Sequence, residues 1–203
     1  MDHVAGLLSL REQKTLQVVC SRAVKDLISK QFPVLPILGR YCKIKYSTFP
    51  IAIAGLRISA LEFSGEKAPR YAGRDGLRGD VMGLKLETRQ GKSFVYVPGL
   101  PAINDEINRF VKGCDCLMVD GTFWSEREMT SLRLTNRTAR EMGHVPITGK
   151  NGTLTWLAEL EVRRKIYTHI NNTNPILRAG SLERKKVERS GVEISYDGMS
   201  MRL

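Results

Sequence analysis

The chain has 203 residues, of which 42% are hydrophobic and 26% charged, with a formal net charge of +11. This length and composition fit one packed globular domain and exclude wholesale disorder. Although the positive charge permits anionic partners, Lys and Arg are spread along the chain, and the tight run at 184–186 lies between Glu183 and Glu188. We read that run as a solvated helix face and expect no nucleic-acid partner.

The first half of the chain predicts strands linked by turns, with one helix. We expect strands at 16–20, 41–46, 56–63, 81–88 and 93–97. Ser21 is a suitable N-cap for a helix through Lys30, which Pro33 and Pro36 would end. The Gly-, Arg- and Asp-rich segment 64–80 predicts a mobile, solvent-facing loop.

The second half of the chain predicts an alternation of helices and strands. We expect helices at 102–111, from Ser125, at 154–160 and from a Ser181 cap to about 189, and strands at 114–120, 165–170 and 192–195. No internal repeat interrupts this order. The sequence therefore predicts a single mixed α/β domain over residues 1–203, with helices covering sheet faces.

The cysteines and the apolar segments suggest where the protein resides. The cysteines are Cys20, Cys42, Cys114 and Cys116. None has the C-x-x-C spacing of a zinc knuckle or a redox site, so we expect reduced, buried thiols in a cytoplasmic protein. No apolar stretch approaches the ~20 residues of a membrane span. No secretory signal follows Met1, because Asp2 and His3 come at once.

All three histidines and two isolated acids fall at the ends of predicted elements. They are His3, His144, His169, Asp80 and Asp120. Imidazoles and carboxylates at strand ends can converge on one rim of a sheet, as a divalent metal requires. Each residue taken alone is more often an ordinary turn or loop residue than a metal ligand, so the residues by themselves leave a metal site as one hypothesis among others.

Two polar segments indicate a binding site more specifically than the isolated acids and histidines do. Asp120 is followed by Gly121, Thr122 and two aromatic residues, which is typical of a lined pocket mouth, with a tight turn and an aromatic core plug as the alternative. His169 begins the segment His-Ile-Asn-Asn-Thr-Asn-Pro, whose amides could fix the His169 ring or contact a ligand. These amides belong to Asn171, Asn172 and Asn174.

Several long blocks resemble the pyrroloquinoline quinone (PQQ) synthesis protein B family. The blocks are 6–12, 32–38, 120–124, 137–144, 169–177 and 196–199, and the similarity runs from residue 2 to the carboxyl end. The resemblance implies a metallo-β-lactamase-like αββα sandwich with a metal site on its rim. The sequence begins inside the family's metal motif, so we expect a late assigned start or a truncation that leaves out the first strands and uncovers apolar sheet faces.

The resemblance also implies a ligand set. Asp2 and His3 match the end of the family's acid/His metal motif, and His169 matches its last histidine ligand. Asp120 stands where the superfamily places a metal-bridging aspartate. Asp80 stands where many relatives have another histidine, which makes the site richer in oxygen and favours iron over zinc, with zinc still possible.

Further residues are candidates for catalysis or ligand binding. His144 falls where related hydrolases keep an auxiliary histidine near the substrate, so His144 and Asp120 are the candidate catalytic residues. Thr122 and Asn172 are candidates for ligand binding. So are three loop arginines that could meet the carboxylates of a substrate or simply form a solvated loop, namely Arg70, Arg74 and Arg78.

The function implied by the resemblance is iron-dependent hydroxylation of the tyrosine-derived part of a PQQ precursor. Asp2, His3 and His169 would then hold iron as two histidines and one carboxylate. The alternatives are a carrier that binds PQQ or its precursor on its way to the periplasm, and an inactive truncated remnant. A nuclease-like hydrolase is disfavoured by Asp80 and by the cut motif. Other PQQ-pathway proteins are implied partners, and a homodimer is left open.

Overall fold

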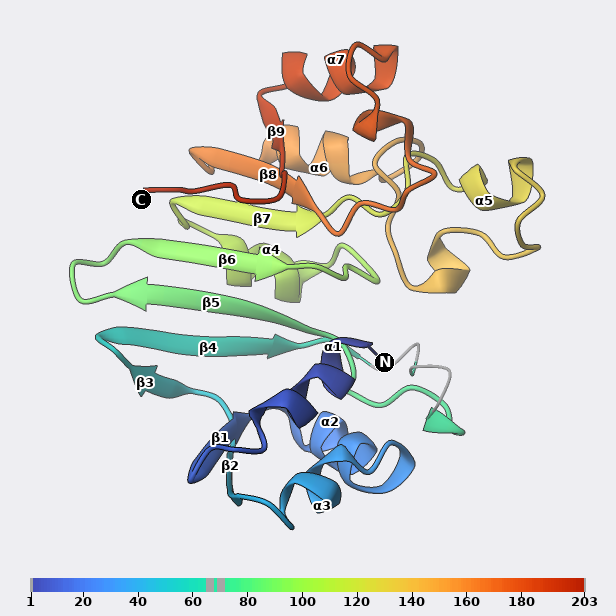
Figure 1. Cartoon of the computed structure of the whole chain (residues 1–203). Helices are drawn as coiled ribbons and strands as arrows, with labels where there is room; N and C mark the ends of the chain where they lie inside the picture. Colours follow the sequence, from blue (N-terminus) through green and yellow to red (C-terminus); the bar gives the residue numbers. More distant parts are fainter. Residues whose placement is uncertain (1, 65–67, 69–71, 203) are drawn as a thin grey trace. The chain divides into compact units, whose positions relative to one another are not determined.

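The computed structural model describes residues 2–64, 68 and 72–202, without the side chains of Asp2 and His3. The chain divides into two compact units, and each is described by itself (Figure 1). Unit 1 comprises residues 1–51 and 62–81, and unit 2 comprises residues 52–61 and 82–203.

Unit 1 combines a small parallel sheet with short helices. Its strands β1 (Thr15–Val19) and β2 (Lys43–Ser47) pair in parallel. The helices are α1 (Asp2–Ala5), η1 (Gly6–Leu10), α2 (Arg22–Asp26), η2 (Leu27–Gln31) and α3 (Val34–Leu38). The buried cluster of unit 1 consists of Cys20, Ile28, Val34, Leu35 and Leu38. Burial of these apolar side chains contributes roughly 1.5–3 kcal/mol for each of the larger ones.

The helical segment after β1 shows one confirmed expectation and one correction. Ser21 is the N-cap of α2, because its Oγ accepts a hydrogen bond from the N–H of Val24 at 3.1 Å. The helical segment that begins after Ser21 ends at Gln31, close to the expected end at Lys30 and before Pro33, but the sequence analysis did not expect the separate helix α3, which begins at Val34. Pro36 is tolerated there because the first turn of a helix leaves its N–H groups without helical partners.

Within the described residues of the larger sheet, seven strands lie side by side in chain order. They are β3 (Ile51–Ile53), β4 (Leu56–Glu62), β5 (Met82–Thr88), β6 (Ser93–Val97), β7 (Cys116–Asp120), β8 (Arg164–Thr168) and β9 (Val192–Ile194). β5 and β6 are antiparallel, and β6 to β9 are parallel. The carboxyl ends of β6, β7 and β8 therefore meet at one edge of the sheet.

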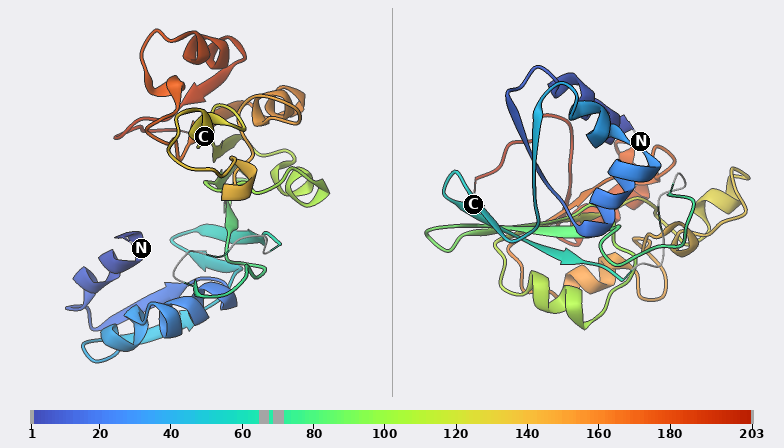
Figure 2. Two further views of the ribbon diagram at one scale, coloured as in Figure 1. Left: turned by 90° about the vertical axis from the view of Figure 1, so that its right-hand side faces the viewer. Right: turned by 90° about the horizontal axis from the view of Figure 1, so that it is seen from below.

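Two helices cover one face of this sheet, α4 (Asp105–Val111) and α6 (Thr153–Glu159) (Figure 2). The strand residues that alternate toward them are buried, and Val95, Val97, Leu117 and Val119 are examples. The remaining helices are α5 (Glu128–Ser131), η4 (Arg140–Met142), η5 (Pro175–Leu177) and α7 (Leu182–Arg189).

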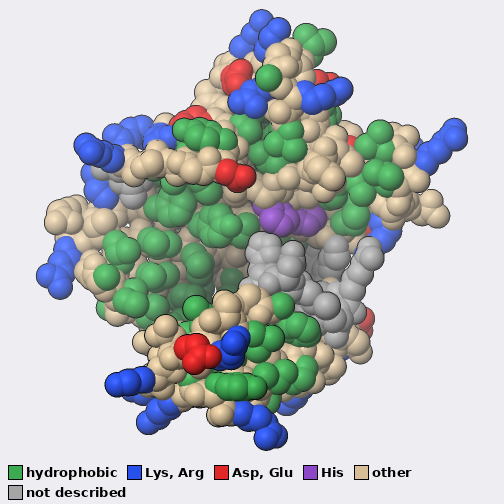
Figure 3. All heavy atoms as spheres, in the orientation of Figure 1, with side chains coloured by type: hydrophobic (Ala, Val, Ile, Leu, Met, Phe, Trp, Pro, Cys, Tyr) green, Lys and Arg blue, Asp and Glu red, His purple; other side chains and the backbone are tan. Residues whose placement is uncertain are grey.

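The opposite face of the sheet is less covered. Its apolar side chains on β5 and β6 are only partly buried, as in Leu84, Leu86, Phe94 and Tyr96. Figure 3 shows hydrophobic side chains gathered on the surface over this part of the sheet.

The structure describes the burial of the cysteines and the length and apolar character of the helices. All four cysteines are buried, and none forms a disulfide. Among the described residues, no helix combines the length and apolar character that crossing a membrane needs. Residues 65–67 and 69–71 of the predicted loop lie outside the described residues.

A candidate metal centre at the ends of the parallel strands

Three side chains that could bind a metal come together in unit 2. Among the side chains that the structure describes, Asp120, His144 and His169 offer ligand atoms that all lie within 4.8 Å of one another. Asp120 ends β7, and His169 directly follows β8, where Asp120 is in register with Thr168. The parallel pairing thus brings two distant sequence positions to the same edge, and the turn after η4 adds His144.

Asp120 is the buried centre of this group, with its side chain 0% exposed. Its Oδ1 accepts from the N–H of Thr122 at 2.9 Å and from the hydroxyl of Thr122 at 2.5 Å. Its Oδ2 accepts from the N–H of Leu100 at 2.8 Å and contacts Nδ1 of His144 at 2.7 Å. A buried carboxylate is tolerated when its oxygens are hydrogen-bonded in this way.

The contact to Asp120 fixes the tautomer of His144. Because an ionised carboxylate only accepts, Nδ1 of His144 must carry the hydrogen, and a neutral ring then has its lone pair on Nε2. The His144 ring stacks on the ring of His169, with centroids 5.4 Å apart and an interplanar angle of 22°, and meets the edge of Phe123 at 5.7 Å. Figure 3 shows histidine side chains reaching the surface.

Thr122 links Asp120 to His169. Its hydroxyl lies 2.8 Å from Nδ1 of His169, 2.9 Å from the carbonyl oxygen of His169 and 3.2 Å from Nδ1 of His144. The single hydroxyl hydrogen goes to an acceptor-only oxygen, either the Asp120 carboxylate or the His169 carbonyl. The close Nδ1 of His169 is therefore the donor to the Thr122 oxygen, and its lone pair lies on Nε2 as well.

The backbone at His169 has an uncommon conformation. Its φ of +55° lies in the left-handed region, where residues other than glycine are rare and cluster at functional sites. The His169 side chain is 51% exposed, far more than Asp120. The His169 ring therefore reaches solvent, although the His169 backbone is strained and its neighbourhood is held by hydrogen bonds.

The segment after His169 is fastened to the loop after β7. Nδ2 of the buried Asn174 donates to the carbonyl of Gly121 at 2.9 Å, and its Oδ1 accepts from the N–H of Ile176. The N–H of Asn171 donates to the carbonyl of Thr122 at 3.1 Å. The side chain of Asn174 and the backbone of Asn171 thus hold the loop after β7, whereas the His169 ring contacts Thr122, Asp120 and the ring of His144. Asn172 is exposed, and its role in ligand binding stays a prediction.

Gly121 allows the strand ends to approach closely. A Cβ atom at this position would lie 2.9 Å from Cβ of Tyr167, closer than real Cβ atoms come to their neighbours. Tyr167 is fully buried, and its hydroxyl lies 2.9 Å from that of Thr153. Burial raises the pKa of the Tyr167 phenol above its ordinary value, so this ring stays neutral.

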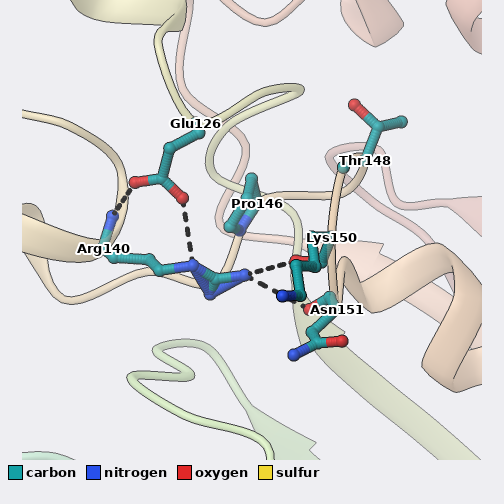
Figure 4. A pocket seen from close by; sticks show the side chains of 7 residues that line it. Glu126, Arg140, Pro146, Thr148, Lys150 and Asn151 are labelled. Carbon is teal, nitrogen blue, oxygen red and sulfur yellow. Dashed lines mark hydrogen bonds and ion pairs between the residues drawn. The ribbon is translucent and has the colours of Figure 1, made fainter.

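The loop that carries His144 is supported by an ion pair that sequence reasoning missed. Arg140 lies 3.0 Å from Oε2 of Glu126 through its Nε, and its N–H donates to Oε1 of Glu126 at 3.1 Å (Figure 4). The Arg140 guanidinium also donates to the carbonyl of Lys150 at 2.9 Å. These residues line a cavity of about 290 Å³. Arg140 thus connects Glu126 and Lys150, which lie on either side of His144 in the sequence.

In unit 1, Asp80 forms an ion pair. Its two oxygens accept from the guanidinium of Arg74 at 2.7 Å each, and Oδ2 accepts from the N–H of Leu77 at 2.8 Å. Burial by itself raises the pKa of the Asp80 carboxyl, but the bonds from Arg74 and Leu77 outweigh it and hold that pKa below its ordinary value. Arg74 therefore has a partner inside its own loop, and metal binding by Asp80 stays a prediction.

For the other predicted site residues, the structure gives little or no information on side-chain contacts. The side chains of Asp2 and His3, and the whole of Arg70, lie outside the described residues. Arg78 is exposed, and its contact with a substrate stays a prediction.

Comparison of the chain with known proteins shows the family to which it belongs. A family model described as a beta-lactamase superfamily domain matches residues 1–170. Coenzyme PQQ synthesis protein B of Methylococcus capsulatus is 40% identical over 214 residues, which cover 100% of this chain and 70% of that protein. The protein of the same name from Cupriavidus necator is 37% identical over 214 residues, with the same coverage.

Solved structures agree with this placement. A zinc-bound PqqB from Methylobacterium extorquens superposes with a TM-score of 0.87 at 28% identity, covering 100% of this chain and 70% of that chain. A diphosphatase of the PhnP family superposes with a TM-score of 0.62 at 12% identity, which shows a shared fold alone. The mixed α/β, metallo-β-lactamase-like fold expected from the sequence is confirmed. The chain belongs to the coenzyme PQQ synthesis protein B family of the beta-lactamase superfamily.

Proposed function

We propose that this protein acts in PQQ biosynthesis as a metal-dependent hydroxylase of the tyrosine-derived part of a PQQ precursor. The observation that carries the proposal is the convergence of Asp120, His144 and His169 at the carboxyl ends of β7 and β8. Family membership supplies the pathway, and the names of the relatives supply PQQ.

The donor set fits a divalent metal. Two imidazoles with lone pairs on Nε2, beside one carboxylate, match the ligand preferences of iron and of zinc. We propose His169 and His144 as ligands, with Asp2 and His3 completing the set that the sequence predicts. Four hydrogen-bonding groups already contact Asp120, so we assign it chiefly to orienting His144, as carboxylates behind ligating histidines do.

Iron is the metal that the proposed reaction needs. Bound iron would supply the activation of dioxygen, whereas zinc has no redox chemistry. Hydroxylation puts one oxygen atom of dioxygen into a C–H bond and releases the other as water, with two electrons from an external reductant. The residues of this chain hold the imidazoles at fixed tautomers through Asp120 and Thr122.

Metal analysis tests the site. The purified chain is loaded with Fe²⁺ or Zn²⁺ under anaerobic conditions, and bound metal is measured after dialysis. We expect His169→Gln and His144→Gln to lose most of the bound metal, and Gln90→Ala, in the exposed turn after β5, to keep it. Full metal content in both histidine variants would contradict the proposed ligands.

Activity is tested on the iron-loaded chain with a tyrosine-containing peptide precursor, dioxygen and ascorbate. We expect a product heavier by one oxygen atom and matching dioxygen consumption, both absent from the zinc-loaded chain. Binding of PQQ by chelated protein, with no dioxygen consumed by the iron form, would overturn the hydroxylase and favour a carrier.

A further inference from the structure

One face of helix α7 combines a leucine with cations. The four residues of this face are spaced i, i+3, i+4 and i+7, so they form one stripe along the helix. They are Leu182, Lys185, Lys186 and Arg189, and all are exposed, whereas Val187 on the opposite face is buried. Leu182 is 80% exposed, more than any other large hydrophobic side chain that the structure describes. Figure 3 shows Lys and Arg side chains on the surface over α7.

The acidic residues of α7 lie off this stripe. Oε1 of Glu188 lies 2.8 Å from Nε of Arg184, so these two charges balance each other within the helix. Glu183 points about 100° away from the residue before it and is partly buried. Among the described residues, neither Lys185 nor Lys186 forms an ion pair. The basic run at 184–186 therefore presents two uncompensated positive charges to solvent.

A second exposed apolar group follows α5. Leu132 is 52% exposed and Leu134 is 60% exposed, and Arg133 between them is exposed as well. Arg133 has a φ of +54°, which is uncommon for a residue other than glycine. The N–H of Leu134 donates to the carbonyl of Met129 at 3.1 Å. The two leucines therefore project from a hydrogen-bonded turn.

Trp124 connects the two elements that carry these leucines. Its N–H donates to Oε2 of Glu128 in α5 at 2.6 Å, and Nζ of Lys186 in α7 lies 6.0 Å from the centroid of its ring. The two elements thus meet at one corner of unit 2, beyond β9 and beyond the carboxyl ends of β7 and β8 (Figure 1). We call this the corner surface, and its residues are Leu132, Arg133, Leu134, Leu182, Lys185 and Lys186.

The chemistry of the corner surface fits a bilayer with anionic headgroups. Apolar side chains can enter the boundary between headgroups and acyl chains while neighbouring cations meet the phosphates. The leucines protrude from two separate short elements, so a partner protein would need a pocket for each, whereas acyl chains admit each one without a matching shape. Cations in the last turn of a helix also suit its dipole, but the dipole gives no reason for exposed leucines.

We propose that the corner surface of unit 2 binds the surface of an anionic lipid bilayer. Leu132, Leu134 and Leu182 enter the boundary of the acyl chains, and Lys185 and Lys186 meet the headgroups. The contact is peripheral, since no helix among the described residues is long and apolar enough to cross a membrane. This inference goes beyond the proposed function and holds whether or not the metal centre hydroxylates a precursor.

Sedimentation of the full chain with vesicles tests the proposal. The vesicles contain phosphatidylcholine alone or phosphatidylcholine with phosphatidylglycerol, and we expect binding to the anionic ones at roughly 0.1 M salt. Lys185→Gln/Lys186→Gln should lower this affinity about 25-fold, at about fivefold for each cation. Leu132→Gln/Leu134→Gln should lower it by roughly tenfold or more, and this relative loss should persist at higher salt because salt does not screen apolar insertion.

Arg57→Gln/Arg89→Gln is the matched control for charge. Both arginines are exposed and lie at the hairpin turns β3–β4 and β5–β6, on the opposite side of unit 2 from α5 (Figure 1). Charges farther away than about 10 Å are largely screened at this salt concentration, so the control should bind like the wild type. A loss as large as that of the lysine variant would mean that the net charge of +11 drives binding, and would overturn the proposal. Thermal unfolding of each variant checks that the fold is intact.

A fluorescent label tests insertion at single positions. The four native cysteines are buried, so an introduced exposed cysteine can be labelled selectively with an environment-sensitive dye. We expect the emission from Leu134→Cys and Leu182→Cys to shift to the blue when anionic vesicles are added, and that from Arg89→Cys to stay unchanged. A wild type that does not bind anionic vesicles, or labels at both leucine positions that stay in water, would overturn the proposal. The second result would favour the acidic surface of a partner protein instead.

Discussion

Nδ1 of His144 lies 2.7 Å from Oδ2 of Asp120, whose side chain is completely buried. The two residues are 24 positions apart, and Arg140, which pairs with Glu126, lies in the segment that leads to His144. A buried carboxylate that holds Nδ1–H of an imidazole leaves Nε2 as the metal-binding atom. This pairing supports the proposal that His144 is a metal ligand.

Asp120→Asn should therefore weaken metal binding and stability together. An amide nitrogen cannot accept, so at least one of the donors from Leu100, Thr122 and His144 loses its partner. We expect a loss of about 2–4 kcal/mol in the free energy of unfolding and roughly 10–100-fold in metal affinity. Urea titration and metal titration measure both, with the exposed Asp105→Asn as the control. Wild-type metal affinity in Asp120→Asn would refute the orienting role.

Thr122→Val removes the hydroxyl that links Asp120 to His169 and keeps a similar shape. We expect metal affinity to fall roughly 10–100-fold, because the His169 ring loses the acceptor for its Nδ1–H. Thr122→Ser keeps the hydroxyl and should stay within a few-fold of the wild type. Isothermal titration with Zn²⁺ measures the difference, and a loss in Thr122→Ser with none in Thr122→Val would mean that the methyl group matters and the hydroxyl does not.

The strands were predictable because their side chains alternate between a buried and a less buried face. Residues 93–97 were expected as a strand and form β6, and β7 starts two residues inside the predicted 114–120. The convergence of Asp120 and His169 also follows from sequence order, since consecutive parallel strands end at one edge. The alternation of side chains does not predict a short helix such as α3. This helix is stabilised by the packing of Val34, Leu35 and Leu38 in the core of unit 1.

The contacts of irregular segments were not predictable in the same way. Arg74 and Asp80 are six residues apart in a loop without periodicity, and the resemblance alone suggested metal or substrate as their partners. Arg140 and Glu126 likewise meet only because the segment between them folds back. A charge-bearing residue in such a segment becomes interpretable once the backbone is known.

Gly121→Ala should destabilise the protein because the new Cβ would lie 2.9 Å from Cβ of Tyr167 at the strand ends. We expect a loss of about 1–3 kcal/mol, typical of overpacking, together with weaker metal binding. Gly6→Ala is the matched control, since Gly6 has no atom within 4 Å of an added Cβ. Thermal unfolding compares the two, and a Gly121→Ala protein as stable as Gly6→Ala would contradict the steric reading.

The cysteine thiols should be unreactive in the folded protein. Burial raises the pKa of Cys114 to about 11, and it also raises the pKa of Cys20 and of Cys116. Since the thiolate is the nucleophile, a disulfide reagent at pH 8 should label almost none of these three thiols until denaturant is added, and burial should keep the reagent from Cys42 as well. Ser200→Cys, at an exposed position, should add one fast-reacting thiol. Fast labelling of the wild type would mean that the packing around these residues is loose.

The Arg74–Asp80 pair should make stability depend on pH in a defined direction. The pKa of Asp80 is lower in the folded chain than its unfolded value of about 3.9, so the folded state favours the ionised form. The stabilisation from the ion pair is fully present at pH values above the pKa that Asp80 has in the unfolded chain. It is lost as the pH falls through the lower pKa that Asp80 has in the folded chain. Arg74→Gln should therefore cost about 1.5–3 kcal/mol at pH 7 and progressively less below about pH 3.9.

Urea unfolding between pH 7 and pH 3 measures this dependence, and Asp80→Asn should follow the same course. A difference from the wild type that stays constant over this range would contradict the ion pair as its source. Metal analysis of the same two variants tests the predicted ligand role of Asp80. If Asp80 only holds Arg74, both variants keep the metal content of the wild type at pH 7. If Asp80 also binds the metal, Asp80→Asn loses metal while Arg74→Gln, which leaves the carboxylate in place, retains it.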